Sequence, residues 1–154
     1  MRFDEHYLKS EKSSYTIEWT NPDLGEEVGE YTENDFTKKY LKSNGIEFKT
    51  EKELLSFLEL GKLVTITKDE LMKKYENLTL SDKDFEDELK DSEYKKSFQS
   101  MEKTLENKKN IKLPSPIVLK INDTYYGFAG NRRMNLAFKY SIPLKVWLVE
   151  KESK

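Results

Sequence analysis

The spacing of apolar residues in the middle of the chain predicts a helix, then a strand and a second helix. Thr50 and Glu53 have the spacing of a capping box, in which a hydroxyl and a carboxylate bond to free amides at the start of a helix. Leucines then recur with helical spacing, at Leu54, Leu55 and Leu58. We expect this first helix to end at Gly61.

A strand that runs directly into a helix is predicted next. Residues 63–66 are rich in β-branched side chains, which favours a strand. Thr67 and Glu70 then form a second capping box. The helix that it opens is expected to reach about Tyr75.

The segments before these elements have shorter patterns. Residues 15–19 alternate between polar and apolar side chains, as in a strand, and residues 21–25 have the composition of a turn. A helix is expected over residues 35–42, with Asn34 as its cap and Gly45 beyond its end.

Residues 82–93 are strongly acidic, and apolar residues at helical spacing continue behind them to about Asn107. The spacing predicts one or two amphipathic helices. We interpret the acidic residues as a solvated helix face in preference to an acidic docking surface.

The last third of the chain has the most regular pattern. Residues 117–121 and 125–129 are predicted to form two strands of a hairpin. Gly130 then turns the chain into a helix that is expected to end near Tyr140. Residues 144–149 alternate and close the segment as a strand. The pattern as a whole predicts an α/β (α+β) fold with a small mixed sheet.

The composition excludes several classes of protein and several kinds of catalytic or metal site. The chain has 154 residues, of which 12% are aromatic, and disordered proteins lack such an aromatic content. It has no cysteine and one histidine, His6, so disulfides, zinc–thiolate sites and a Ser-His-Asp triad are not expected. The net charge of −2 does not suggest a broad nucleic-acid surface. No apolar run is long enough for a membrane span, so we expect a cytoplasmic protein without a membrane partner.

Residues 130–133 carry the most specific chemistry, the sequence Gly-Asn-Arg-Arg at a strand-to-helix junction. Glycine permits an unusual backbone and close approach of a ligand. The amides of Asn131, Arg132 and Arg133 would be unpaired at the start of the helix, where the helix dipole favours an anion. Two arginines are unfavourable there unless a negative group, such as a phosphate, offsets them. An alternative of equal weight is that both arginines pair with the acidic helix around Asp87.

The order of these elements resembles the ParB/sulfiredoxin superfamily, often labelled ParB-like nuclease domains. The resemblance covers Ile111 to Val149, with the sequence from Gly130 to Ala137 similar to the Gly-Glu-Arg-Arg box of partition proteins. It suggests a ParB-like domain over residues 62–150, preceded by an extension over residues 1–61. Small free-standing members of this kind are common in bacteriophage genomes.

The resemblance also implies a ligand and a site. Members bind CTP, ATP or ADP, so one of these nucleotides with magnesium would be the cofactor. Gly130 would allow close approach, and Arg132 and Arg133 would contact phosphates. Asn131 stands where sulfiredoxins hold their cysteine, which excludes sulfiredoxin activity, and it replaces the glutamate common in partition proteins.

Three functions remain open at this point. The first is an enzyme acting at a phosphate, namely a nucleotide hydrolase, a phosphotransferase or a nuclease. The second is a binding module for a nucleotide or for the phosphates of a nucleic acid. The third is a non-catalytic interaction protein, for example a phage factor that binds a host protein.

Overall fold

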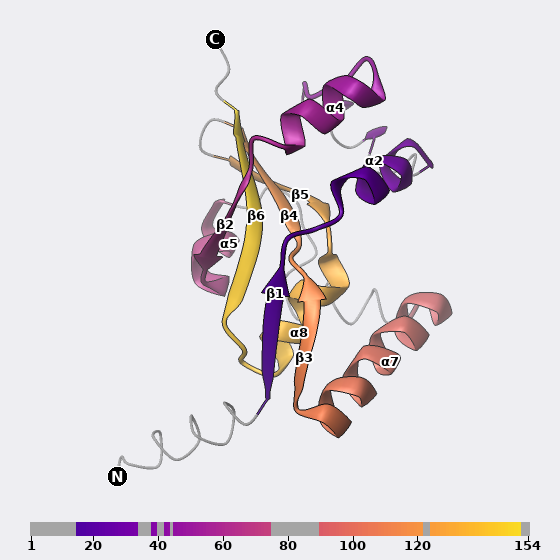
Figure 1. Ribbon diagram of the computed structural model, residues 1–154, viewed down its shortest axis with the longest axis vertical. Helices are drawn as coiled ribbons and strands as arrows, with labels where there is room; N and C mark the ends of the chain where they lie inside the picture. The colour runs from indigo at the N-terminus through magenta and orange to yellow at the C-terminus, as the bar shows by residue number, and fades with distance from the viewer. Residues whose placement is uncertain are drawn as a thin grey trace.

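A four-stranded mixed sheet forms the centre of the computed structural model, which describes residues 15–33, 38–39, 42–43, 45–74, 90–121 and 124–151 (Figure 1). In spatial order the strands are β2 (Lys62–Ile66), β6 (Leu144–Lys151), β4 (Ile117–Ile121) and β5 (Thr124–Ala129). Strand β6 is antiparallel to β2 and parallel to β4, while β4 and β5 form an antiparallel hairpin. The predicted mixed α/β architecture and these four strands are confirmed.

A second, two-stranded sheet joins distant parts of the sequence. Strand β1 (Thr16–Thr20) runs parallel to β3 (Asn110–Pro114). Strand β1 was expected, but β3 was not, because the prolines at its end suggested only the end of a helix. The amide of Ser115 donates to the carbonyl of Thr20 over 2.8 Å, and the chain then continues directly into β4.

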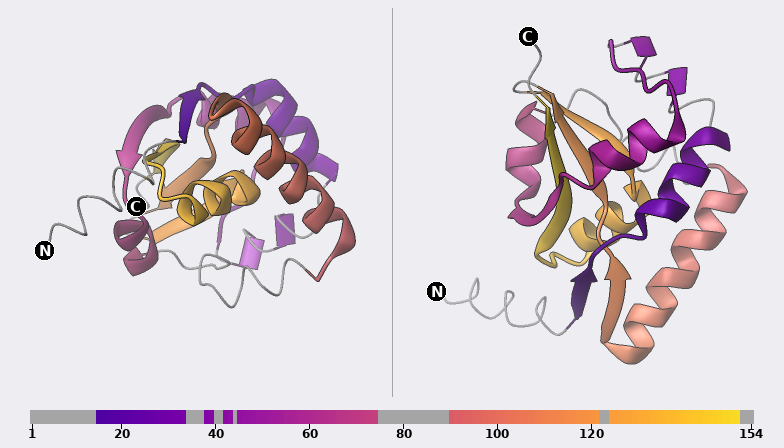
Figure 2. Two further views of the ribbon diagram at one scale, coloured as in Figure 1. Left: turned by 90° about the horizontal axis from the view of Figure 1, so that it is seen from below. Right: turned by 45° about the horizontal axis from the view of Figure 1, so that its top comes forward.

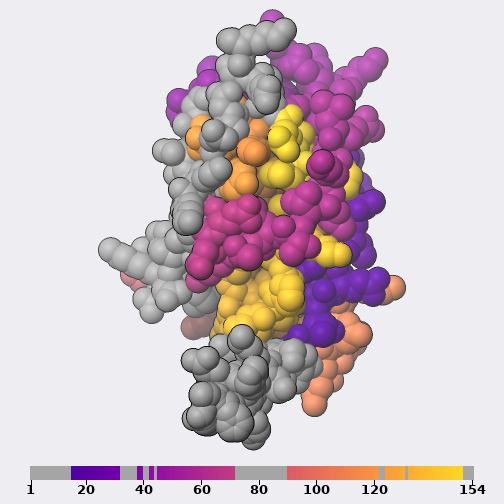
Figure 3. All heavy atoms as spheres, turned by 90° about the vertical axis from the view of Figure 1, so that its left-hand side faces the viewer, coloured from indigo at the N-terminus to yellow at the C-terminus, as the bar shows by residue number. Residues whose placement is uncertain are grey.

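Helices cover both faces of the central sheet. Their bounds are Leu24–Glu33 (α2), Glu51–Leu58 (α4), Lys68–Lys74 (α5), Ser92–Lys108 (α7) and Asn131–Lys139 (α8). Side chains along β4 alternate between two apolar clusters, so these clusters lie on opposite faces. One contains residues of α2 and α4, and the other contains residues of α5, α7 and α8. Figure 2 shows α7 and α8 side by side, and Figure 3 shows β2 and α5 at the edge of the sheet that faces the viewer, in front of β6.

Residues before Gly61 contribute to both apolar clusters. Ile17 and Trp19 pack with residues of α7 and α8, while Leu54 and Leu58 pack against β4 and β6. The indole Nε1 of Trp19 also donates to the carbonyl of Pro143 over 2.9 Å. The division of the chain at residue 61 stays a prediction, but the described residues on its two sides share both apolar clusters.

Both predicted capping boxes have their expected hydroxyl bonds. The Glu53 amide donates to Thr50 Oγ1 over 3.0 Å, and the Glu70 amide donates to Thr67 Oγ1 over 3.1 Å. The carboxylate of Glu53 accepts from the amide of Lys49 over 3.1 Å, one residue before the cap. These bonds explain why α4 and α5 begin where the sequence predicts.

The turn predicted over residues 21–25 is wrong at its end, because α2 begins at Leu24. Asp23 Oδ1 accepts the amide of Glu26 over 3.0 Å and so caps the helix. The helix expected over residues 35–42 lies largely outside the described residues. So do His6, the hairpin turn at 122–123 and the acidic residues up to Leu89.

No helix in the described part of the chain combines the length and the apolar character needed to cross a membrane.

Candidate phosphate-binding turn

Gly130 connects β5 to α8 in a left-handed conformation, with φ 92° and ψ 22°. A β-carbon on this residue would lie 2.7 Å from the Cα atom of Pro116, which is closer than side chains tolerate. The carbonyl of Pro116 accepts the amide of Trp147 over 2.7 Å and is thereby held in place. Both the backbone conformation and the neighbouring strand connection therefore require glycine at position 130.

The first turn of α8 presents its backbone amides without a side-chain cap. No side chain caps the helix, since its N-cap residue is Gly130, and its first turn contains no acidic residue. The first helical bond runs from the Met134 amide to the Gly130 carbonyl over 3.0 Å. The preceding amides of the helix belong to Asn131, Arg132 and Arg133, and they lie at its positive end.

Arg133 folds back over this turn and meets a carboxylate from α2. Its Nη2 atom lies 2.8 Å from the position that a β-carbon on Gly130 would take. The same Nη2 atom lies 3.6 Å from Oε2 of Glu27, and the two side chains are only 20% and 12% exposed. Among the described residues, the buried Nε of Arg133 has no hydrogen-bond partner. Within the described residues, the guanidinium is therefore held by one long ion pair, to Glu27.

Burial dominates the electrostatics of this pair. It raises the pKa of Glu27 above its usual value, although the charge of Arg133 acts in the opposite direction. Burial likewise lowers the pKa of Arg133, and Glu27 only partly offsets that effect. The attraction between the two groups therefore compensates incompletely for the water that both have lost.

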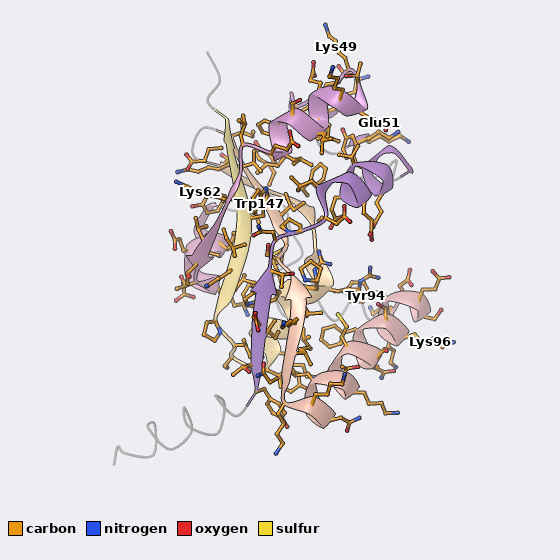
Figure 4. The ribbon with its side chains drawn as sticks, viewed as in Figure 1. Lys49, Glu51, Lys62, Tyr94, Lys96 and Trp147 are labelled. Atoms are coloured by element: carbon orange, nitrogen blue, oxygen red, sulfur yellow. The ribbon has the colours of Figure 1, made fainter. Side chains whose placement is uncertain are left out.

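Arg132 lies on the exposed side of the same turn. Its guanidinium carbon is 5.6 Å from the ring centre of Tyr94, which is a cation–π contact. The hydroxyl of Tyr94 accepts a bond of 3.0 Å from Nδ2 of the buried Asn135, so α7 presents this ring toward α8 (Figure 4). Within the described part of the chain, no carboxylate lies at ion-pair distance from Arg132.

The structure thus gathers Gly130, Arg132 and Arg133 at one turn, whereas the side chain of Asn131 lies outside the described part. The expected alternative partner of the arginines was the helix around Asp87, which is also outside it. Arg133 pairs instead with Glu27, a residue that the sequence reasoning missed together with α2. Asp23 followed three residues later by Glu26 was the signal for that helix.

Tyr94 was expected only as part of an apolar helix face, so its contact with Arg132 was also missed. Nothing in its spacing along the chain indicated a partner on α8. The ring reaches Arg132 because α7 and α8 pack together, which is a property of the tertiary structure.

The residues at the turn suit a phosphate better than a metal ion. Amides and arginines are the groups that bind phosphate oxygens. In the described segments, no three His, Cys, Asp or Glu side chains gather as a metal-binding group. Glu27, a carboxylate that reaches the turn, is paired with Arg133. The nucleotide and the magnesium implied by the resemblance both stay predictions.

No family model, curated protein or solved structure matches the chain.

Proposed function

We propose that the protein binds a phosphate group of a nucleotide or a nucleic acid at the start of α8. The observation that carries the proposal is the composition of this helix end. It has two arginines, no acidic residue and no side-chain cap in its first turn, behind a left-handed glycine. Arginines at the positive end of a helix are unfavourable, and a bound anion would offset that cost.

Arg132 and the helix amides are the proposed primary contacts. Arg132 is exposed, and its contact with the Tyr94 ring restricts where the guanidinium lies. A guanidinium presents parallel N–H groups to two phosphate oxygens, and the amides at the start of α8 point along the helix axis toward the same region. Arg133 would supply a second cation from the inner side of the turn.

The resemblance to ParB/sulfiredoxin proteins supports the same turn as the site. It also suggests which ligands to test first, namely ATP, ADP and CTP. The proposal concerns binding alone, and the hydrolase, phosphotransferase and nuclease activities would each need a further group that acts on the bound phosphate.

Isothermal titration with ATP, ADP, CTP, GTP and a short DNA, with and without magnesium, tests the proposal. We expect Arg132→Ala to weaken binding about tenfold or more, because it removes a charged hydrogen-bond donor. Lys96→Ala is the matched control, since it removes the same charge from an exposed position on α7 (Figure 4). Equal affinity of Arg132→Ala and Lys96→Ala would contradict the proposed site.

A further inference from the structure

A carboxylate of the chain itself already lies at the turn where phosphate is proposed to bind. Glu27 projects from α2 to Arg133, and Arg133 in turn lies against Gly130 at the start of α8. The two side chains are largely buried, so the contact belongs to the packed interior. Glu27 therefore brings a negative charge to the positive end of α8.

This ion pair is a weak competitor for a phosphate. Its 3.6 Å separation is longer than a charge-assisted hydrogen bond, and it engages one nitrogen of the guanidinium. The buried Nε of Arg133 makes no bond within the described residues. A phosphate carries more charge than a carboxylate and has three terminal oxygens, so it can engage two guanidinium nitrogens at once.

We propose that Glu27 is an internal competitor of the ligand: it occupies Arg133 while the turn is empty, and a bound phosphate displaces it. The inference rests on the proposed function and adds a residue that sets the affinity of the site. It also links occupancy of the turn to α2, a helix that lies far from α8 in the sequence.

The charges around Glu27 determine which control is needed. Glu26 and Glu30 flank it on α2, and Arg132 lies beside Arg133 on α8. Removing any acidic residue near an anion site strengthens binding through general electrostatics. If Glu27 has a specific role, its removal must increase the phosphate affinity more than the removal of Glu30 does. Glu30 is exposed on α2, and its charge acts on both Glu27 and Arg133.

The test compares the binding of ATP and of inorganic tripolyphosphate to the wild type, Glu27→Gln and Glu30→Gln. Titration calorimetry at one pH and one salt concentration gives the affinities, and circular dichroism checks the fold of each variant. We expect Glu27→Gln to bind both probes about tenfold more tightly than the wild type, since the amide cannot compete as an anion. Glu30→Gln should change the affinity less than threefold.

The possible failures separate the two proposals. If the wild type and Glu27→Gln bind a probe equally, the competitor role is wrong and the phosphate site stands. If equal gains come from Glu27→Gln and Glu30→Gln, the effect is general electrostatics and the competitor role is again wrong. If no variant binds either probe, even with the competing carboxylate removed, both proposals fail.

Hydrogen exchange of the wild type provides a readout that needs no substitution. Displacement of Glu27 removes a contact of α2, so we expect amides of residues 24–33 to exchange faster when ATP is bound. If the amides of this segment exchange more slowly, or at the same rate, in the protein saturated with ATP, the bound phosphate does not displace Glu27.

Discussion

The indole of Trp147 lies directly on Gly61, so that a β-carbon on the glycine would clash with Nε1. The same Nε1 atom donates a hydrogen bond of 2.8 Å to the carbonyl of Leu58. Helix α4 ends at Leu58 and strand β2 begins at Lys62, so one side chain of β6 holds the connection between them (Figure 4). The role of Gly61 is to leave room for this indole.

Replacement of Gly61 by alanine should therefore destabilise the protein. The added methyl would push the indole away from Leu58, and overpacking of this kind costs about 2 kcal/mol in the free energy of unfolding. Chemical denaturation of the wild type and Gly61→Ala, followed by tryptophan fluorescence, measures the difference.

Gly29→Ala is the control for this substitution. It lies inside α2, and no heavy atom lies within 4 Å of the β-carbon that alanine would add. Alanine is the better helix former, so Gly29→Ala should raise the free energy of unfolding by up to about 1 kcal/mol. A loss of stability in both variants would contradict the packing argument for Gly61.

Substitution by alanine should destabilise the protein to different degrees at the two left-handed glycines. Gly45 has φ 80° and no heavy atom within 4 Å of an added β-carbon, whereas Gly130 has φ 92° and meets Pro116 at 2.7 Å. Gly45→Ala should cost about 1 kcal/mol from backbone strain alone. Gly130→Ala should cost about 3 kcal/mol or more, because the strain and the clash add. Thermal denaturation of both variants checks the order, and equal costs would show that the clash is relieved.

Local patterns were sufficient to predict most elements of the central sheet. Strands β4 and β6 are marked by β-branched or alternating side chains, and α8 is marked by the glycine before it. The elements that were missed depend on other information. Strand β3 exists because β1 pairs with it across most of the sequence, and α2 contains two glycines that lower its helix propensity.

Only the part of the candidate site that is contiguous in the sequence could be predicted. Gly130, Arg132 and Arg133 are neighbours in the sequence, so a single motif indicated them. Glu27 and Tyr94 reach the turn from two other helices, and no spacing along the chain relates them to it. The partner of a charged side chain is determined by tertiary packing, which is why both arginines were assigned a different acidic helix as an alternative.

The bond between Asn135 and Tyr94 allows the ring and the hydroxyl to be tested separately. Tyr94→Phe keeps the ring beside Arg132 but removes the acceptor of a bond from Asn135, whose side chain is buried. We expect a loss of about 1 kcal/mol in the free energy of unfolding and little change in phosphate affinity. Tyr94→Leu should weaken phosphate binding as well, because Arg132 then loses its cation–π contact.

Tyr15→Phe is the control for the hydroxyl. Its ring packs edge-on against Tyr140 with centroids 5.3 Å apart, and within the described residues its hydroxyl makes no hydrogen bond. Its removal should change the free energy of unfolding by less than about 0.5 kcal/mol. A loss equal to that of Tyr94→Phe would remove the case for a specific bond to Asn135.

The burial of Glu27 predicts a pH dependence of stability. Its pKa is raised from 4.5 in the folded protein, mainly by burial and further by Glu30 and Glu26, while Arg133 opposes the shift. At pH values between 4.5 and the raised pKa, the Glu27 carboxyl holds a proton in the folded protein but has lost it in the unfolded chain. The free energy of unfolding that this carboxyl contributes therefore falls as the pH rises through that interval. Glu27→Gln lacks the titrating group, so the wild type should lose stability relative to this variant over the same interval.

Denaturant titrations of both proteins from pH 4 to pH 7 measure the difference in the free energy of unfolding. If the wild type instead becomes more stable relative to Glu27→Gln as the pH rises, the ion pair with Arg133 outweighs burial.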